Sequence, residues 1–180
     1  HIPLRRQRQM CIRDRDKSIK GLFLRVNSPG GSGFASEIIR QRLELLNKKI
    51  PIVISMGDIA ASGGYWISMN QNTIIANPFT LTGSIGVWAA LPNFKDSFEN
   101  VGILFDKVST NELNFSLLEP PNDNLSSFMQ SYVDGSYNKF IKLVSKNRQL
   151  TIDNTEKIAQ GRIWSCLLYT SDAADEAECV

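Results

Sequence analysis

The sequence predicts an α/β fold in which a mainly parallel sheet is flanked by helices. Two short apolar runs that are typical of buried strands, residues 21–27 and 51–57, stand on either side of a segment with helical periodicity. A strand, a helix and a strand within ~40 residues form a βαβ unit, whose strands lie parallel with a right-handed crossover. A turn rich in small residues follows each strand.

The segment between these strands has an apolar set of residues and a charged set at helical spacing. The apolar set is Ala35, Ile38, Ile39, Leu43 and Leu46, and the charged set is Glu37, Arg40, Glu44 and Lys48. We therefore expect the apolar set to face the core of the protein and the charged set to face solvent.

Further elements follow from the same patterns. We expect strands at residues 73–76, 85–91 and 102–108, short helices at residues 94–100 and 153–160, and a loop at residues 109–124. A long helix over residues 125–144, capped by Asp123 or Asn124, has apolar residues at steps of three, one and four. Its aromatic residues suit either the core or an interface, and we expect them in the core.

Composition limits the kind of protein. The 180 residues are 42% hydrophobic and 21% charged with a net charge of +2, which suits one folded domain and does not indicate nucleic-acid binding. No apolar stretch reaches the ~18 residues that a membrane-spanning helix needs. Residues 1–16 are basic and residues 166–180 are acidic, and these ends hold all three cysteines. Both ends are similar to translated sequencing-adaptor DNA, so we expect them to be non-native or disordered and the folded domain to span residues 17–165.

Several kinds of chemistry are excluded. The only histidine is His1, so residues 17–165 cannot form a Ser-His-Asp triad. They offer no Cys/His cluster for a metal, and the chain has no glycine-rich phosphate or dinucleotide motif, so no cofactor is expected. Hydrolysis without histidine leaves a serine or threonine that another base activates, most often lysine.

Ser62 is the best candidate nucleophile. It lies where the second strand turns into a predicted helix, and Ala60, Ala61, Gly63 and Gly64 surround it. Small neighbours allow a substrate backbone to approach, and free amide groups at a helix start can bind an oxyanion. The alternative is that Ser62 only caps the helix, and the local sequence favours the cap.

The loop after the first strand is ambiguous in the same way. Gly30 or Gly31 could supply a second amide for an oxyanion, or the loop could be a tight turn that caps the next helix. Both small-residue loops follow parallel strands of one βαβ unit. Their positions at the carboxyl ends of those strands predict that they face a common crevice.

Three motifs in order, within residues 24–32, 60–68 and 80–87, together with residues 158–164, resemble the SppA family of signal peptide peptidases. The resemblance implies a ClpP/crotonase-like spiral of βαβ units and a Ser-Lys catalytic dyad. It implies that Ser62 is the nucleophile and that Gly30 or Gly31, with Gly63, forms the oxyanion hole. It also implies that Ser84 orients the lysine amine, although Ser84 alone would be read as a turn hydroxyl.

The chain departs from the single-repeat members of that family at the lysine. Asn111 or Glu112 stands where the lysine would be, and Lys107 lies inside the predicted strand, where we expect a structural role. In the two-repeat members the N-terminal repeat donates the lysine and the C-terminal repeat donates the serine. The chain is therefore expected to be a truncated C-terminal repeat that needs a lysine from the missing N-terminal repeat and is inactive by itself.

The resemblance also implies a setting. We expect a peptide substrate such as a signal-peptide remnant, a homo-oligomer, and a place at the bacterial inner membrane with the catalytic domain on the periplasmic or extracellular side and the anchor outside this chain. Two alternatives stay open. The first is a crotonase-like acyl-CoA hydratase or isomerase, for which the loop region offers little carboxylate besides Asp58. The second is a non-catalytic scaffolding repeat.

Overall fold

A twisted sheet built around one long strand forms the body of the protein. The computed structural model describes residues 18–70, 73–108, 110, 115–166 and 178–179. The strands are β1 (Leu22–Ser28), β2 (Ile52–Ala61), β3 (Thr73–Ala76), β4 (Leu81–Gly83), β5 (Ile163–Ser165) and β6 (Glu178–Cys179). Strands β1, β3 and β4 all pair with β2 in parallel, β6 pairs with β3 in parallel, and β5 pairs with β4 antiparallel. The predicted βαβ unit and the strand at residues 73–76 are confirmed.

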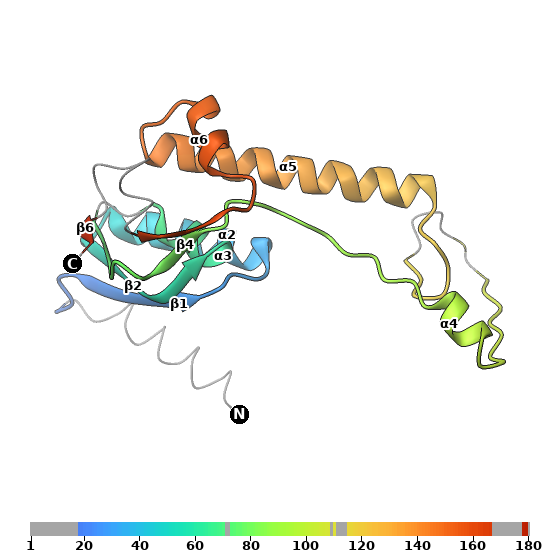
Figure 1. Ribbon diagram of the computed structural model, residues 1–180. Helices are drawn as coiled ribbons and strands as arrows, with labels where there is room; N and C mark the ends of the chain where they lie inside the picture. Colours follow the sequence, from blue (N-terminus) through green and yellow to red (C-terminus); the bar gives the residue numbers. More distant parts are fainter. Residues whose placement is uncertain (1–17, 71–72, 109, 111–114, 167–177, 180) are drawn as a thin grey trace.

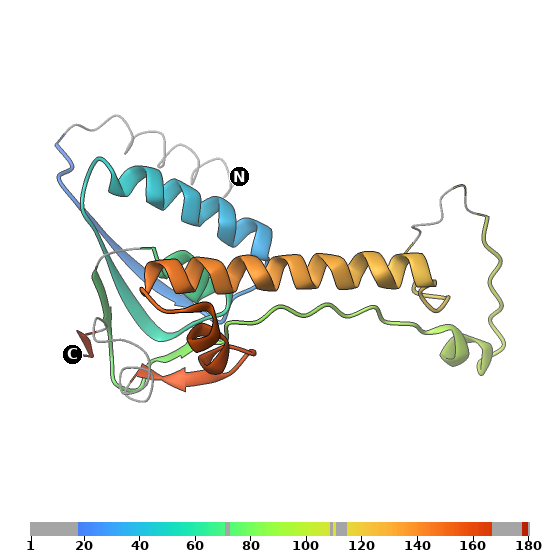
Figure 2. The ribbon, with the colours of Figure 1, turned by 90° about the horizontal axis from the view of Figure 1, so that it is seen from above.

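Helices cover one face of this sheet. The helices are α2 (Gly33–Asn47), α3 (Gly63–Ser68), α4 (Lys95–Glu99), α5 (Asp123–Asn147) and α6 (Ile152–Ile158). Helices α2 and α3 lie directly on the sheet, and the C-terminal half of α5 lies above them (Figure 1). Seen from above, α5 runs beside α2 and then continues well past the sheet (Figure 2). The predicted short helices at 94–100 and 153–160 are confirmed as α4 and α6.

Strand β2 is longer than the sequence predicts. It does not end at Gly57 but continues to Ala61, because its first half pairs with β1 and its second half gains β4 as a partner. The register against β1 shifts after Val26, where Asn27 Oδ1 accepts a hydrogen bond of 3.2 Å from the Ile59 amide. The extended strand delivers the chain directly to Ser62.

The buried face of α2 is only partly the predicted one, since Leu43 and Leu46 pack in the core as expected. Ser36, Arg40 and Leu43 are buried, whereas Ile38 and Ile39 are 45% and 44% exposed. The reason is an ion pair inside the protein, in which the Arg40 guanidinium bonds the Glu37 carboxylate at 2.8 Å. Because that pairing satisfies the charges, the helix can turn Glu37 and Arg40 toward the body, and Ile38 and Ile39 are left facing outward.

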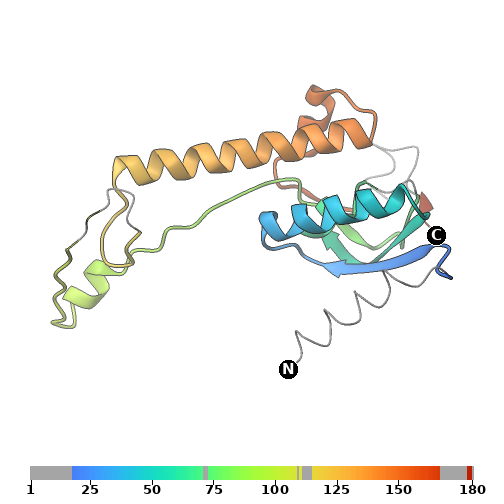
Figure 3. The ribbon, with the colours of Figure 1, turned by 180° about the vertical axis from the view of Figure 1, so that it is seen from behind.

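Helix α5 plays two structural roles along its length. Its 25 residues span about 37 Å, and the helix continues past the sheet (Figure 2). Phe140, Ile141 and Val144 in the C-terminal half are buried, as predicted, but Phe128 and Tyr132 are each 55% exposed. Their expected core position is wrong because the N-terminal half projects beyond the sheet (Figure 3). The predicted caps are also displaced, since Asn122 accepts the capping hydrogen bond from Leu125.

The described residues 87–108, 110 and 115–122, together with the N-terminal half of α5, form a projection that we call the arm (Figures 1 and 3). The strands predicted at 85–91 and 102–108 are wrong, because neither segment has a strand partner among the described residues. Ile85 instead inserts alone into the core, and Leu104 and Val108 are 81% and 95% exposed. Of the loop predicted at 109–124, the described residues before α5 have no regular structure.

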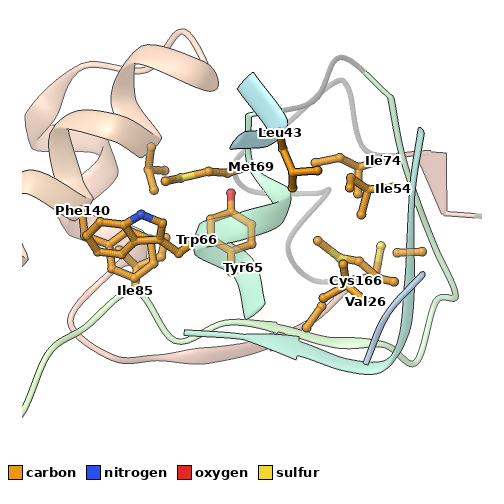
Figure 4. Packing of buried hydrophobic residues seen from close by; sticks show 14 of the residues in the cluster. Val26, Leu43, Ile54, Tyr65, Trp66, Met69, Ile74, Ile85, Phe140 and Cys166 are labelled. Carbon is orange, nitrogen blue, oxygen red and sulfur yellow. The ribbon is translucent and has the colours of Figure 1, made fainter. Parts of the chain in front are cut away.

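The core centres on the contact between α3 and α5. The Phe140 ring lies 4.3 Å from the Trp66 ring and 6.5 Å from the Tyr65 ring, measured between centroids. Figure 4 shows Phe140, Trp66 and Ile85 grouped at one end of the core, with Ile54 and Ile74 at the other. This cluster fixes α3, and therefore the turn that precedes it, against the long helix.

Replacement of Phe140 by alanine tests that role. We expect Phe140→Ala to lower the free energy of unfolding by about 3–5 kcal/mol, because it removes a ring that is only 1% exposed. Phe128→Ala, on the same helix but 55% exposed, is the control and should change it by no more than about 0.5 kcal/mol. Urea denaturation followed by circular dichroism measures both, and equal effects would contradict the described packing.

Candidate active site

Ser62 occupies a strained corner between β2 and α3. Its backbone has φ 51° and ψ −118°, a conformation that non-glycine residues rarely adopt. Its amide donates to the Gly83 carbonyl at 2.8 Å, and its carbonyl accepts from the Trp66 amide at 2.8 Å. The backbone is thus held on both sides. The side chain makes no capping hydrogen bond, so the expected alternative of a simple helix cap has no support in the geometry.

The glycine loop after β1 lies directly against this corner. A Cβ atom on Gly30 would come within 2.7 Å of the Ser62 Cβ and 2.8 Å of the Gly63 nitrogen, and its φ is +113°. A Cβ on Gly63 would come within 2.6 Å of the Ser36 Oγ. Any side chain at these glycines would therefore push the two loops apart. The sequence prediction that both loops face one crevice is consistent with this contact.

Two of the three candidate amides are free to bind a ligand. The Gly30 amide donates to the Ser28 Oγ at 3.1 Å. The Gly31 and Gly63 amides have no hydrogen-bond acceptor in the part of the chain that the structure describes. A Cβ on Gly31 would meet nothing within 4 Å, so that residue faces open space. Helix α2 is capped by Ser32, whose Oγ accepts a hydrogen bond from the Ala35 amide.

Ser84 lies at the end of β4, next to the strand that carries Ser62. Its φ is 50°, and its amide donates to the Arg162 carbonyl at 2.7 Å. The carbonyl of the preceding residue, Gly83, accepts the hydrogen bond from the Ser62 amide. Ser84 is therefore positioned by the same backbone ladder as Ser62, although no hydrogen bond joins the two hydroxyls among the described residues.

A groove of about 1190 Å³ brings the predicted residues together. Its lining includes Gly30, Gly31, Ser62, Gly63 and Ser84. The aromatic rings of Trp66, Tyr137 and Phe140 form another part of the lining. The groove therefore combines an unpaired hydroxyl, free amides and apolar walls, which suits an extended peptide backbone with apolar side chains.

Glu37 is a groove residue that the sequence prediction assigned to solvent. Its carboxylate accepts hydrogen bonds from the Trp66 indole at 2.8 Å, from Gln41 at 2.8 Å and from Arg40, and it pairs with the Lys139 ammonium at 3.0 Å. Burial raises the pKa of Glu37, but these hydrogen bonds outweigh burial and hold the pKa well below its usual range. Pairing with Glu37 raises the pKa of Arg40 in turn, against the effect of burial.

Trp66, Lys139 and Phe140 also line the groove, and the sequence prediction gave them no role in the site. Only short-range spacing was visible for Glu37, namely Arg40 and Gln41 three and four positions further along the helix. Its contacts with Trp66 and Lys139 cross from α2 to α3 and α5. Such tertiary contacts leave no signal in a single sequence.

The lysines of the described chain do not complete a dyad with Ser62. Lys139 is the only lysine among the described residues that line the groove, and its ammonium binds Glu37 rather than Ser62. The prediction that Lys107 lies in a strand is wrong. Lys107 lies in the arm, where it pairs with Glu119. Asn111 and Glu112 provide no comparison, because residues 111–114 lie outside the described residues.

The described residues contain neither a metal site nor a membrane-spanning helix. Within the described residues no group of histidine, cysteine, aspartate and glutamate side chains could hold a metal ion. No helix in the same residues is both long and apolar enough to cross a bilayer.

Comparison with known protein families identifies the chain. A family model described as Peptidase family S49 matches residues 44–175, which include Ser62, Gly63 and Ser84. The chain belongs to peptidase family S49. The resemblance predicted from the sequence motifs is thereby confirmed.

Curated relatives carry names that agree with this family. Protease 4 of Haemophilus influenzae is 48% identical over 151 residues, which are 83% of this chain and 25% of that protein. Protease 4 of Salmonella typhi is 43% identical over 152 residues, again 83% of this chain and 25% of the relative. A putative signal peptide peptidase SppA of Enterococcus faecium is 33% identical over 153 residues, 83% of this chain and 44% of the relative. The chain thus spans about a quarter of the length of the two Protease 4 relatives.

Solved structures support the predicted fold. A ClpP1 mutant from Listeria monocytogenes superposes with a TM-score of 0.57 at 10% sequence identity, over 86% of this chain and 71% of that one. The S49 chain therefore has the ClpP/crotonase-like α/β fold. At this identity the likeness concerns the fold alone.

The Glu37 cluster predicts a specific response to acid. The unfolded carboxyl titrates near 4.5, whereas the folded one titrates lower, so below pH 4.5 the unfolded state binds more protons and stability falls. Stability from this group is fully present above that value and is lost as the pH falls through the folded pKa. We expect Glu37→Gln to be less stable than wild type at about pH 7 and to lose less stability between about pH 7 and about pH 3.

Urea denaturation of the chain at both pH values measures this difference. Glu44→Gln is the matched control, because Glu44 also binds Arg40 but is 46% exposed and does not reach the groove. It should keep the acid sensitivity of the wild-type chain. Parallel acid curves for wild type and Glu37→Gln would contradict the described cluster.

Proposed function

We propose that this S49 chain is the serine-bearing half of a peptidase active site, with the Ser62 hydroxyl as the nucleophile. The observation that carries the proposal is the corner between β2 and α3. A half-buried serine is held there at φ 51°, and its side chain forms no capping bond and lines a groove. Holding a non-glycine residue in such a conformation costs on the order of 1–3 kcal/mol, and strain of this kind is concentrated at functional sites.

The Gly31 and Gly63 amides are the proposed oxyanion hole. Both lack an acceptor in the described chain, and a Cβ on Gly63 would lie 3.3 Å from the Gly31 nitrogen, so the two donors are neighbours. The Gly30 amide is the weaker candidate because it already binds Ser28. Gly30 instead keeps the two loops in contact. Donors fixed before the reaction stabilise the developing negative charge without reorganisation.

The general base is proposed to be a lysine from outside this chain, in the N-terminal repeat of a two-repeat parent protein. Lys139 is unsuited because its ammonium is bound to a carboxylate, and Lys107 lies in the arm. A lysine acts as a base only when neutral, and burial in an apolar pocket favours the neutral amine. Ser84, at the end of the adjacent strand, is proposed to accept or donate the hydrogen bond that orients that amine.

The reaction proceeds in two balanced stages. The neutral lysine amine takes the Ser62 proton as the Ser62 Oγ bonds to the carbonyl carbon, and the carbonyl oxygen becomes an oxyanion facing the two amides. The C–N bond then breaks, and the lysine ammonium returns its proton to the leaving amine. Water, deprotonated by the same lysine, attacks the acyl-serine ester, releases the carboxylic acid and restores the hydroxyl.

The substrate class follows from the groove. Trp66, Val87 and Phe140 offer apolar walls, and the glycine loop offers backbone groups to an extended chain. Peptides with small or apolar side chains, such as remnants of signal peptides, fit this lining. Because such remnants derive from membranes, we propose that the parent protein works at the bacterial inner membrane, with this domain on the periplasmic or extracellular side.

The hydratase alternative is less well supported by the groove. Enolate chemistry needs a carboxylate that can exchange a proton in the pocket. Asp58 is exposed and does not line the groove. Glu37 does line it, but four hydrogen-bonding groups hold its pKa well below the usual range, so it is a poor proton acceptor. A purely scaffolding repeat would not explain why a strained serine faces free amides.

Replacement of Ser62 tests the assignment. In the full-length parent we expect Ser62→Ala to lower cleavage of an internally quenched apolar peptide by at least about 10⁴-fold. Thr73→Ala is the control and should leave cleavage unchanged, because Thr73 is exposed at the start of β3, outside the groove and the arm. A fluorophosphonate should label wild type at position 62, and the isolated 180-residue chain should not cleave the peptide. Cleavage that survives Ser62→Ala would refute the assignment.

The arm is proposed to bind the partners that complete the site, namely the missing repeat and further copies in a homo-oligomer. The arm exposes several large apolar side chains close together, which is unusual for a surface that faces only water. They include Val101, Leu104, Val108 and Phe128, which are 69%, 81%, 95% and 55% exposed. The apolar run at 102–108 has strand composition but no strand partner in the described chain. A surface of this kind is typical of protein interfaces.

An acidic substitution in the arm tests this surface. We expect Leu104→Asp to raise the dissociation constant of the full-length assembly by at least about 10-fold, because it buries a charge at an apolar contact. Phe79→Asp is the control, since Phe79 is 84% exposed but lies in the turn between β3 and β4. Sedimentation velocity over a concentration series measures both. An arm variant that assembles like wild type would exclude this role for the arm.

A further inference from the structure

Glu37 joins the two helices that begin at the two halves of the proposed oxyanion hole. Helix α2 starts at Gly33, just after Gly31, and α3 starts at Gly63. The Trp66 indole Nε1, one turn into α3, donates a hydrogen bond of 2.8 Å to the Glu37 Oε2, one turn into α2. This is a direct side-chain link between the two helices, close to the ends that carry the free amides.

The link has little freedom to relax. Trp66 is 5% exposed and its ring packs at a tilt against the Phe140 ring, with 4.3 Å between the centroids, so the indole has little room to turn away. The Glu37 carboxylate is 13% exposed and is held on the α2 side by Arg40, which is itself buried. Both ends of the hydrogen bond are therefore anchored in packed structure. A change in its length would have to move one helix relative to the other.

A third element reaches the same carboxylate. Lys139 on α5 pairs with the Glu37 Oε1 at 3.0 Å, and both residues line the groove. The ammonium is 50% exposed, so this contact is weaker than the indole bond. The carboxylate thus ties α2 to α3 through a buried contact and to α5 through an exposed one.

Small displacements between the helices matter because the glycine contacts are close. The Gly30 Cα lies 3.3 Å from where a Gly63 Cβ would be, so the two loops touch without any intervening side chain. No hydrogen bond between backbone groups of these two loops occurs in the described chain. The pairing of β1 with β2 brings the loops together and ends at Ser28 and Ala60. Beyond that point, the spacing of the Gly31 and Gly63 amides depends on how α2 and α3 are held together.

We propose that Glu37 is a positioning residue, which acts through the Trp66 indole to set the spacing of the Gly31 and Gly63 amides for the transition state. The inference rests on the proposed peptidase function but assigns a role to a residue that does not touch the reacting atoms. Oxyanion-hole donors contribute 10²–10³-fold each to kcat, so a modest displacement of one donor should reduce kcat by about 10- to 100-fold.

The variants are chosen to separate the indole link from the charge. Glu37→Ala removes the acceptor, Trp66→Phe removes the donor and keeps an aromatic ring, and Glu37→Gln keeps an acceptor but removes the charge. All are made in the full-length parent and assayed with an internally quenched apolar peptide. Glu44→Gln, which alters Arg40 pairing outside the groove, is the control.

We expect Glu37→Ala and Trp66→Phe each to lower kcat by about 10- to 100-fold with KM within about threefold, because only transition-state binding is affected. The double variant should be no slower than the worse single variant, since both remove one link. Glu37→Gln should recover most of kcat. Fluorophosphonate labelling of Ser62 should slow in parallel with kcat, and Glu44→Gln should match wild type.

Other outcomes overturn the inference. Additive losses in the double variant, losses confined to KM, or a Trp66→Phe variant with wild-type kcat would each do so. If Glu37→Ala fails to fold, the kcat of Trp66→Phe relative to wild type decides the inference, provided that the two proteins have the same thermal stability. Failure of the proposed function gives a different result. The Ser62→Ala variant would then cleave the peptide as well as wild type does, or the fluorophosphonate would not label wild type at position 62.

Discussion

The direct contact between the Gly30 loop and the Ser62 corner is the constraint on which the rest of the site depends. The two loops meet backbone to backbone, with no room for a Cβ atom at Gly30 or Gly63. That contact is possible because β1 and β2 are adjacent parallel strands whose ends reach the same edge of the sheet. It places a hydroxyl and two amides without an acceptor in the described chain within one groove, which is the serine side of the acyl-transfer site that we propose.

The energetic support for this corner comes from elsewhere in the protein. Ser62 is held in an unfavourable backbone conformation by hydrogen bonds to Gly83 and Trp66. Trp66 in turn is fixed by the Phe140 ring and by the Glu37 carboxylate. A buried ion pair is weak evidence for stability by itself, but it can specify one arrangement of packed elements. Here the Glu37 and Arg40 pair specifies how α2 faces α3.

Several features of the described residues support the proposal that the site is completed from outside them. The serine side of the site is assembled, whereas the described lysines are paired elsewhere or lie in the arm. The arm and the outer face of α2 expose apolar side chains that have no partner in the described residues. Relatives named Protease 4 are about four times as long as the matched segment, since it covers 25% of them. Both facts agree with a site shared between this chain and another part of a larger protein.

The amino-acid sequence by itself determined the fold class, the βαβ unit, the short helices and the two small-residue loops that meet in the groove. These features follow from local rules. The spacing of apolar residues, the residues that favour turns and the positions of glycines each determine the structure of only a few neighbouring residues. Ser62 and the glycine loop were visible as candidates for the same reason, since small residues after strands leave a recognisable pattern. Their assignment to a site, and any role for Ser84, came only from the resemblance of three ordered motifs to a known family.

Only the tertiary structure decided which faces and segments are buried. Arg40 is inside and Ile38 outside because a carboxylate on the same helix meets an indole from another one. Residues 102–108 have strand composition but no strand, because a strand needs a partner and the described chain supplies none there. Glu37 became part of the site in the same way. Its chemistry depends on contacts between elements far apart in the sequence, and such contacts exist only once the chain has folded.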